Sequence, residues 1–294
     1  MSVIAVVNRK GGSGKSTLAT HIAAYCALRG AAVAIADIDR QQSTRAWLRQ
    51  RKAQLAGESM RITAWNVDPR SFVRPPVGID HVVIDTPGGL TGLDLARVVM
   101  YADALVVPIG ASIFDRESAA ACLAELRTLP RVASGRCRIG AIGMRVEAHS
   151  ASAEALLGWS NEQKLQILAV LPQSSAYVAC IDKGLTLFDR PLEEIEADLL
   201  HWKPLLQWLR PLVRPAANAS EPVLGSAVAA RSADAPVVDQ PRPEPSPYQA
   251  KTTAPVVAAE RSDPGPVAPK DKVAPAKGGL LGGLVIPGFL HRRS

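Results

Sequence analysis

The stretch Lys10-Gly11-Gly12-Ser13-Gly14-Lys15-Ser16-Thr17 lies between an apolar run, Val3 to Val7, and an apolar helical pattern, Leu18 to Leu28. A strand, a glycine-rich loop and a helix in this order predict a phosphate-binding loop, because glycines let backbone N–H groups surround phosphate oxygens. The helix that begins at Lys15 directs its positive end at the same anion. The stretch therefore indicates an α/β nucleotide-binding fold.

Two side chains of this stretch suit a nucleotide. Lys15 is placed to reach the β- and γ-phosphates, and the Ser16 hydroxyl is placed to bind Mg²⁺. The stretch departs from the common form G-x-x-x-x-G-K-[ST], because Arg9 occupies the position of the first glycine and a second lysine, Lys10, precedes Gly11. We interpret Gly11 to Thr17 as nucleotide contacts.

Two further apolar runs end in carboxylates. Residues 32–36 lead into Asp37-Ile38-Asp39, and residues 81–84 lead into Asp85-Thr86-Pro87-Gly88. A carboxylate at the carboxyl end of a buried strand, beside a phosphate site, is suited to support Mg²⁺ and its waters. We therefore expect Asp85 at the metal, and the Gly88 N–H facing the terminal phosphate on a loop that moves upon hydrolysis.

The form K-G-G-x-G-K-[ST] of residues 10–17 resembles the deviant Walker motif of the ParA/MinD family of ATPases. In that family the extra lysine crosses a dimer interface and contacts the nucleotide of the partner chain. The resemblance implies the cofactors ATP and Mg²⁺ and an ATP-bound homodimer, in which Lys10 acts with Lys15 in catalysis. It also implies that Asp39 is a second catalytic carboxylate, which positions the attacking water, and that Ser16, Asp39 and Asp85 surround the metal.

The resemblance extends beyond the three nucleotide segments, and part of it concerns the base. Residues 107–115, which end in Ser112-Ile113-Phe114-Asp115, resemble the loop after the next strand of the family. Pro172 resembles the strand end whose following loop approaches adenine. The base-reading position of the family corresponds to Met144-Arg145, although the family commonly has asparagine there.

The departures from the family concern DNA. Many partition members bind DNA non-specifically through arginines in two C-terminal segments, where this chain has His149, Gln173 and Ala176. Eight other cations are candidate substitutes: Arg127, Arg131, Arg136, Arg138, Arg145, Lys183, Arg190 and Arg210. A net charge of +7 and a pI near 9.4 favour a polyanionic partner such as DNA.

Apolar runs alternate with helical patterns through residue 212. We predict strands at Val3–Val7, Val33–Ala36, Ile62–Val67, Val82–Ile84, Ala104–Pro108, Cys137–Met144 and Gln166–Leu171. We predict helices near residues 15–29, 41–56, 91–101, 115–129, 150–160 and 191–202, with Pro204 ending or kinking the last and Leu205–Leu209 forming a separate short stretch. This alternation indicates one doubly wound, mostly parallel sheet covered on both faces, the fold of a P-loop NTPase.

The composition changes after this domain, which we assign to residues 1–212. Residues 213–277 are rich in Pro, Ala, Val and Ser, without helical or strand periodicity, and we expect a disordered linker. Residues 278–294 are apolar with a basic end. Two interpretations of this segment stay open: an inert end, or a short hook for a partner or a membrane surface.

The four cysteines, Cys26, Cys122, Cys137 and Cys180, contain no C-x-x-C pair, which favours reduced, buried thiols. The N-terminus enters a strand directly, so we expect no secretory signal. These features favour a cytoplasmic protein, and the resemblance to the ParA/MinD family implies that it is associated with the nucleoid.

We hypothesise a weak ATPase, stimulated by a partner, that partitions or positions DNA or a large intracellular cargo. We expect a cargo adaptor or an activating protein as a partner. We also expect that the protein uses the nucleoid as its matrix, through non-specific binding to DNA. The alternative is a MinD-like spatial regulator of division or of an envelope complex that cycles on the membrane, with residues 278–294 as its anchor.

Overall fold

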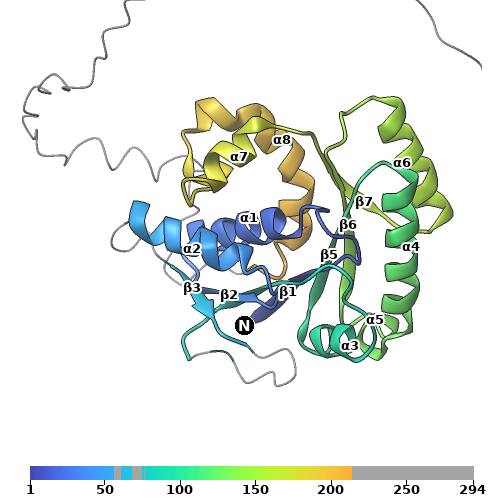
Figure 1. Ribbon diagram of the computed structural model, residues 1–294, viewed down its shortest axis with the longest axis horizontal. Coiled ribbons are helices and arrows are strands. Elements are labelled where there is room, and N and C mark those ends of the chain that lie inside the picture. The colour runs from blue at the N-terminus through green and yellow to red at the C-terminus, as the bar shows by residue number, and fades with distance from the viewer. Residues whose placement is uncertain (56–60, 68–74, 76, 214–294) are drawn as a thin grey trace, which may run out of the picture. The chain divides into compact units, whose positions relative to one another are not determined.

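The computed structural model describes residues 1–55, 61–67, 75 and 77–213. Within them, seven strands form one parallel sheet in the order β3-β2-β4-β1-β5-β6-β7 (Figure 1). The strands are β1 (Ser2–Val6), β2 (Val33–Asp37), β3 (Ile62–Trp65), β4 (His81–Asp85), β5 (Ala104–Ile109), β6 (Arg138–Met144) and β7 (Ile167–Leu171). The predicted sheet is confirmed, and every strand pair in it is parallel.

Helices cover both faces of this sheet. The first group packs on one face: α1 (Lys15–Leu28), α2 (Ser43–Gln54), α7 (Ser175–Ile181), the 3-10 helix η2 (Leu187–Asp189) and α8 (Leu192–Leu209). The second group packs on the other: α3 (Gly92–Tyr101), α4 (Ile113–Thr128), α5 (Pro130–Ala133) and α6 (Ala151–Glu162). Strand β1 shows the division, because Ile4 and Val6 face the first group, and Val3 and Ala5 face the second.

The end of the domain differs from the sequence-based expectation. Helix α8 does not end at Pro204, which lies inside it, and the separate stretch predicted at residues 205–209 is the last part of the same helix. Proline in a helix interior costs about 3 kcal/mol. Burial of Trp202, Leu205 and Leu209 on the two sides of Pro204 offsets that cost, so packing outweighs the local preference.

A buried histidine joins α1 to the C-terminal elements. The His21 ring stacks on Trp202 at 5.1 Å between ring centroids and meets Phe188 edge-on. His21 Nδ1 is 2.8 Å from the Thr17 carbonyl oxygen, and the Leu187 N–H donates to Nε2 at 3.3 Å. Nδ1 therefore carries the proton, and burial lowers the pKa of His21 to about 4.

A buried ion pair fastens α2 to the segment before α8. Arg51 donates to both carboxylate oxygens of Asp189, at 2.7 and 2.8 Å, and to the Gly184 carbonyl oxygen at 3.2 Å. Asp189 also accepts the N–H and hydroxyl of Thr186, at 2.7 Å each. A Cβ atom at Gly184 would overlap the backbone nitrogen of Arg51, so the two segments meet backbone to backbone.

All four cysteines are buried and free, as the sequence predicts. Burial raises the pKa of Cys26 to about 12 and that of Cys122 and Cys137 to about 11. The helices of the described ranges include none with the length and apolar character needed to cross a membrane. The domain boundary at residue 212 stays a prediction, and the segments 213–277 and 278–294 lie outside the described residues, apart from Val213.

Candidate nucleotide site

The glycine-rich loop connects β1 to α1 at the carboxyl edge of the sheet. Gly12 and Gly14 have φ values of 68° and 98°, a left-handed conformation that favours glycine. A Cβ at Gly14 would also lie 2.7 Å from the terminal methyl of Met144. The N-cap residue of α1 is Gly14, which has no side chain to cap the backbone N–H groups of the first turn.

Lys15 is held inside this loop. Its side chain is buried, and Nζ donates to the Lys10 carbonyl oxygen at 2.9 Å. Burial lowers the pKa of Lys15, and the nearby carboxylates of Asp85 and Asp39 oppose that shift. A poorly hydrated ammonium group placed at a glycine loop is a strong attractor for phosphate. Ser13, which is also buried, has a hydroxyl with no hydrogen-bond partner in the described part of the chain.

Asp85 lies fully buried at the end of β4, next to the loop. Neither of its carboxylate oxygens has a hydrogen-bond partner among the described residues. Burial raises the pKa of Asp85 to about 7, although the nearby Ser16 hydroxyl and the Lys15 ammonium oppose that shift. An unpaired buried carboxylate is costly unless a cation or water satisfies it, which fits a support for hydrated Mg²⁺. No three His, Cys, Asp or Glu side chains of the described ranges form a cluster that could hold a metal ion by itself.

The two carboxylates after β2 have different surroundings. Asp37 is buried and accepts the Asp39 N–H at 3.1 Å, the Thr44 hydroxyl at 2.6 Å and the Arg45 N–H at 3.1 Å. Asp39 is only half-buried and accepts the Gln41 N–H at 2.9 Å. Asp37 thus shapes the loop and holds the first turn of α2, while Asp39 stays accessible to solvent. Sequence reasoning assigned no role to Asp37, although the Asp-x-Asp pattern marks it.

The loop after β4 lies directly on the glycine-rich loop. A Cβ at Gly88 would meet the backbone N and Cα of Gly11 at 3.1 Å, and the Gly89 N–H donates to the Arg9 carbonyl oxygen at 2.6 Å. The Thr86 hydroxyl donates to the Val6 carbonyl oxygen at 2.8 Å. The two loops are therefore in direct contact, and the role of Gly88 as a sensor of the γ-phosphate stays a prediction.

Lys10 makes an ion pair within its own chain. Its Nζ lies 2.6 Å from Asp115 Oδ1, and the Ser112 hydroxyl donates to Asp115 Oδ2 at 2.5 Å. Burial alone raises the pKa of Asp115, but the bonds from Lys10 and Ser112 outweigh it and lower that pKa below its usual range. The Lys10 N–H is fixed by the Asn8 side-chain oxygen at 3.0 Å. Sequence reasoning quoted Asp115 within residues 107–115 but did not identify it as the partner of Lys10.

The residues predicted near the base lie at the ends of β6 and β7. Met144 is buried beneath Gly14, so it supports the phosphate loop. Arg145 follows it with an exposed side chain and a φ of 56°. Pro172 follows β7, whose Leu171 carbonyl oxygen accepts the Val146 N–H at 3.2 Å. Base contact by Met144, Arg145 and Pro172 stays a prediction.

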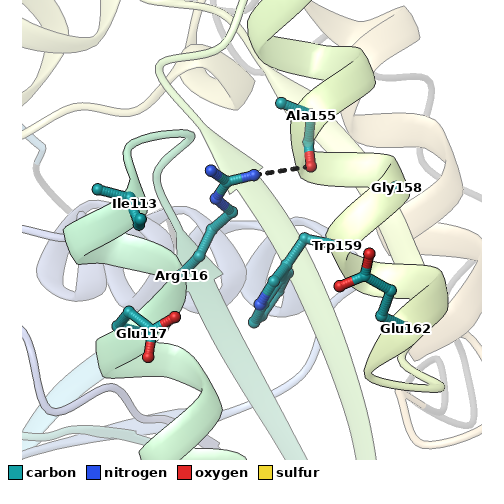
Figure 2. A pocket seen from close by; sticks show the side chains of 7 residues that line it. All are labelled: Ile113, Arg116, Glu117, Ala155, Gly158, Trp159 and Glu162. Carbon is teal, nitrogen blue, oxygen red and sulfur yellow. Dashed lines mark hydrogen bonds between the residues drawn. The ribbon is translucent and has the colours of Figure 1, made fainter.

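A groove of about 330 Å³ lies between α4 and α6 (Figure 2). It is lined by Ile113, Arg116, Glu117, Ala155, Gly158, Trp159 and Glu162. The Arg116 guanidinium donates to the Ala155 carbonyl oxygen at 3.0 Å, which ties the two helices together. None of the predicted nucleotide residues lines this groove, and its mixed apolar and charged walls do not select one ligand.

The sequence is similar to two named proteins over part of their length. It is 39% identical over 108 residues to the Maintenance of carboxysome distribution protein A of Gloeobacter kilaueensis, and the matched region covers 36% of this chain and 48% of that protein. It is 29% identical over 165 residues to the chromosome-partitioning ATPase Soj of Thermus thermophilus, and the matched region covers 46% of this chain and 66% of Soj. The chain thus spans about half of the first relative and just under two thirds of the second.

Two solved structures share the fold. An ATP complex of McdA from Cyanothece superposes with a TM-score of 0.56 at 17% identity, covering 75% of this chain and 99% of McdA. The cell division protein MinD of Aquifex aeolicus gives 0.55 at 16% identity, with 71% and 96% covered. Residues 4–187 match the model of the CobQ/CobB/MinD/ParA nucleotide binding domain, and because they make up more than half of the 294 residues, the chain belongs to this family.

Proposed function

We propose that the chain is an ATPase that dimerises around Mg²⁺-ATP and positions a large intracellular cargo. One observation carries the proposal: Lys15 and the unpaired Asp85 are both buried beside the glycine-rich loop. Burial of an ammonium and of a partnerless carboxylate destabilises the free protein. A site with these costs is retained where phosphate and a hydrated cation satisfy both groups.

The residues of the site have separate roles in hydrolysis. Lys15 and the N–H groups of residues 11–17 would hold the β- and γ-phosphates, and Ser16, Asp39 and Asp85 would hold Mg²⁺ and its waters. At this place the metal would supply positive charge that stabilises the negative phosphate oxygens. Asp39, the more accessible carboxylate, orients the water that attacks the γ-phosphorus while the bond to the bridging oxygen of ADP breaks.

Lys10 supplies the dependence on a second chain. Its side chain is 37% exposed, whereas Asp115 is 12% exposed, so the lysine is the accessible half of the pair. The triphosphate of a partner chain carries more negative charge than one carboxylate and attracts the ammonium more strongly. Dimerisation then depends on the γ-phosphate, because ADP offers less charge.

The cargo function rests on the relatives and on charge. The matched proteins are named for carboxysome distribution and for chromosome partitioning, and the chain has a net charge of +7. We therefore propose that the protein binds DNA non-specifically and is located on the nucleoid, and that a cargo adaptor stimulates hydrolysis.

Three single variants test this function. Lys15→Ala abolishes ATP binding, Asp39→Ala binds ATP and forms a persistent dimer without hydrolysis, and Lys10→Ala binds ATP but stays monomeric. Equilibrium binding of labelled ATP and analytical ultracentrifugation with a slowly hydrolysed analogue measure these outcomes. The exposed Lys164→Ala serves as the control and behaves as wild type. A Lys10→Ala protein that dimerises like wild type would remove the role given to this lysine.

A further inference from the structure

Helix α2 carries a stripe of cations along one flank. Arg45, Arg49 and Lys52 follow the spacing i, i+4, i+7, which places them on one side of a helix. The buried side of the helix consists of Thr44, Trp47, Leu48 and Arg51. The exposed Arg40 lies just before the helix, in the loop after β2. We call Arg40, Arg45, Arg49 and Lys52 the α2 stripe.

The charge of the α2 stripe is not balanced by the rest of the described chain. Five cations and no carboxylate occur between Arg40 and Gln54, and of these only Arg51 has an ion pair in the part of the chain that the structure describes. Arg45 Nε is buried without a hydrogen-bond partner in the same ranges. Like charges one helical turn apart, as at Arg45 and Arg49, destabilise a helix. Such an arrangement fits a polyanionic partner.

Several cations elsewhere are already engaged. Arg190 pairs with Glu194, and Arg131 bonds to Asp103 at 3.0 Å. Arg138 donates to the Trp208 carbonyl oxygen and lies 4.7 Å from the centre of that ring. Arg127 donates to the Gln163 carbonyl oxygen at 2.6 Å. These four candidate DNA contacts are therefore less available to phosphate than the α2 stripe.

We propose that the α2 stripe binds the phosphate backbone of duplex DNA. This inference rests on the proposed function and names its DNA surface. Arg45 and Lys52 are separated by about 10 Å along the helix, at 1.5 Å per residue, so their side chains can reach different phosphates of one backbone. Contacts of this kind carry no sequence information and produce the non-specific binding that a nucleoid matrix requires.

The position of α2 also links this surface to the nucleotide site. Asp37 accepts the Thr44 hydroxyl and the Arg45 N–H, so the residue that shapes the loop of Asp39 also holds the first turn of α2. A change in that loop upon ATP binding therefore reorients the start of the stripe. ATP affects DNA affinity through this connection as well as through dimerisation.

The test compares two triple variants with the same change in charge. Arg45→Gln/Arg49→Gln/Lys52→Gln removes the stripe from α2, and Arg61→Gln/Lys164→Gln/Lys203→Gln removes three exposed cations that are not among the candidate DNA contacts. Fluorescence anisotropy measures binding to a labelled random-sequence duplex at several salt concentrations, with and without the ATP analogue. The double variant Arg49→Gln/Lys52→Gln changes only exposed side chains. It keeps the test valid if the substitution of the half-buried Arg45 prevents the triple variant from folding.

The stripe variant is expected to lose at least about tenfold in DNA affinity, with a shallower salt dependence of about 0.9 in slope for each lost phosphate contact. The control triple loses less than about twofold in DNA affinity, and both triple variants bind ATP as wild type does.

Equal DNA affinity of the stripe variants and wild type overturns the proposal that the α2 stripe binds DNA and leaves the proposed ATPase function intact. Wild-type binding to vesicles with anionic lipid but not to DNA, lost in the stripe variant, overturns DNA as the partner. Failure of ATP-dependent dimerisation overturns the proposed function. In that case the comparison of DNA affinities without nucleotide still tests whether the α2 stripe binds DNA.

Discussion

Two ion pairs of nearly equal length differ in their burial and in the number of their contacts. Lys10–Asp115 spans 2.6 Å and Arg51–Asp189 spans 2.7 Å. The first is a single contact from a lysine that is 37% exposed, while the second is two-pronged, with exposures of 3% and 8%. In addition, the Thr186 N–H and hydroxyl satisfy Asp189.

The difference separates a contact that can open from one that holds. Water near Lys10 replaces much of what the ammonium loses when it leaves Asp115, and Asp115 keeps the bond from the Ser112 hydroxyl, so opening costs less than breaking a pair that is buried on both sides. Breaking the Arg51–Asp189 pair leaves the buried charge of Asp189 without its counter-ion, with only the two Thr186 donors, which costs several kcal/mol. The nucleotide edge of the molecule, with the first turn of α2, is therefore arranged to change, and the layer formed by the last part of α2 around Arg51 and by α8 is arranged to stay fixed.

The largest effect is expected from Arg51→Ala. The variant leaves Asp189 buried without its main partner and lowers the free energy of unfolding by about 3–5 kcal/mol. Urea denaturation measures this loss. Arg49→Ala, two residues away and exposed, serves as the matched control and changes stability by less than about 0.5 kcal/mol. Equal stability of the two variants would contradict the fixed character of this layer.

A second, slightly smaller effect concerns His21, which belongs to the same fixed layer. Burial lowers its pKa from 6.5 to about 4, so the unfolded chain takes up a proton at higher pH than the folded protein. Stability is therefore full above pH 6.5 and falls as the pH drops toward 4, by about 3 kcal/mol in total from this group.

Urea denaturation between pH 7.5 and 4, in wild type and His21→Gln, isolates this contribution. His21→Gln is less stable at pH 7.5 but shows a shallower decline, because the titrating group is gone. The exposed His149→Gln keeps the decline of wild type. An identical decline in wild type and His21→Gln would mean that His21 is not held neutral.

The smallest effect is expected at the other ion pair. Asp115→Asn keeps the shape of the side chain but removes the charge that holds Lys10, so stability changes by less than about 1 kcal/mol. The released lysine is free to reach a partner chain, and ATP-dependent dimerisation strengthens by up to about fivefold. Sedimentation with the ATP analogue measures it, with Glu117→Gln on the same helix as control. Weaker dimerisation of Asp115→Asn would show that the pair supports the interface.

Local patterns predicted the sheet, the phosphate loop and the edge at which Asp39 and Asp85 lie, because strand periodicity and glycine chemistry act over a few residues. Contacts between distant segments were not predictable in this way. Arg51 and Asp189 are 138 residues apart, and nothing near either residue indicates the other. Pro204 misled for the same reason, since the packing of Trp202 and Leu205 decides the helix and is not visible in the local sequence.

The backbone crossing at Gly184 has a consequence for protein engineering. Since a Cβ there would overlap the backbone nitrogen of Arg51, no choice of neighbouring side chains makes room for another residue. Helix α2 and the segment around Gly184 therefore form one transplantable unit. A chimaera that takes α2 from a relative must take the residues near 184 from the same relative, because otherwise α2 and the segment around Gly184 will not pack against each other.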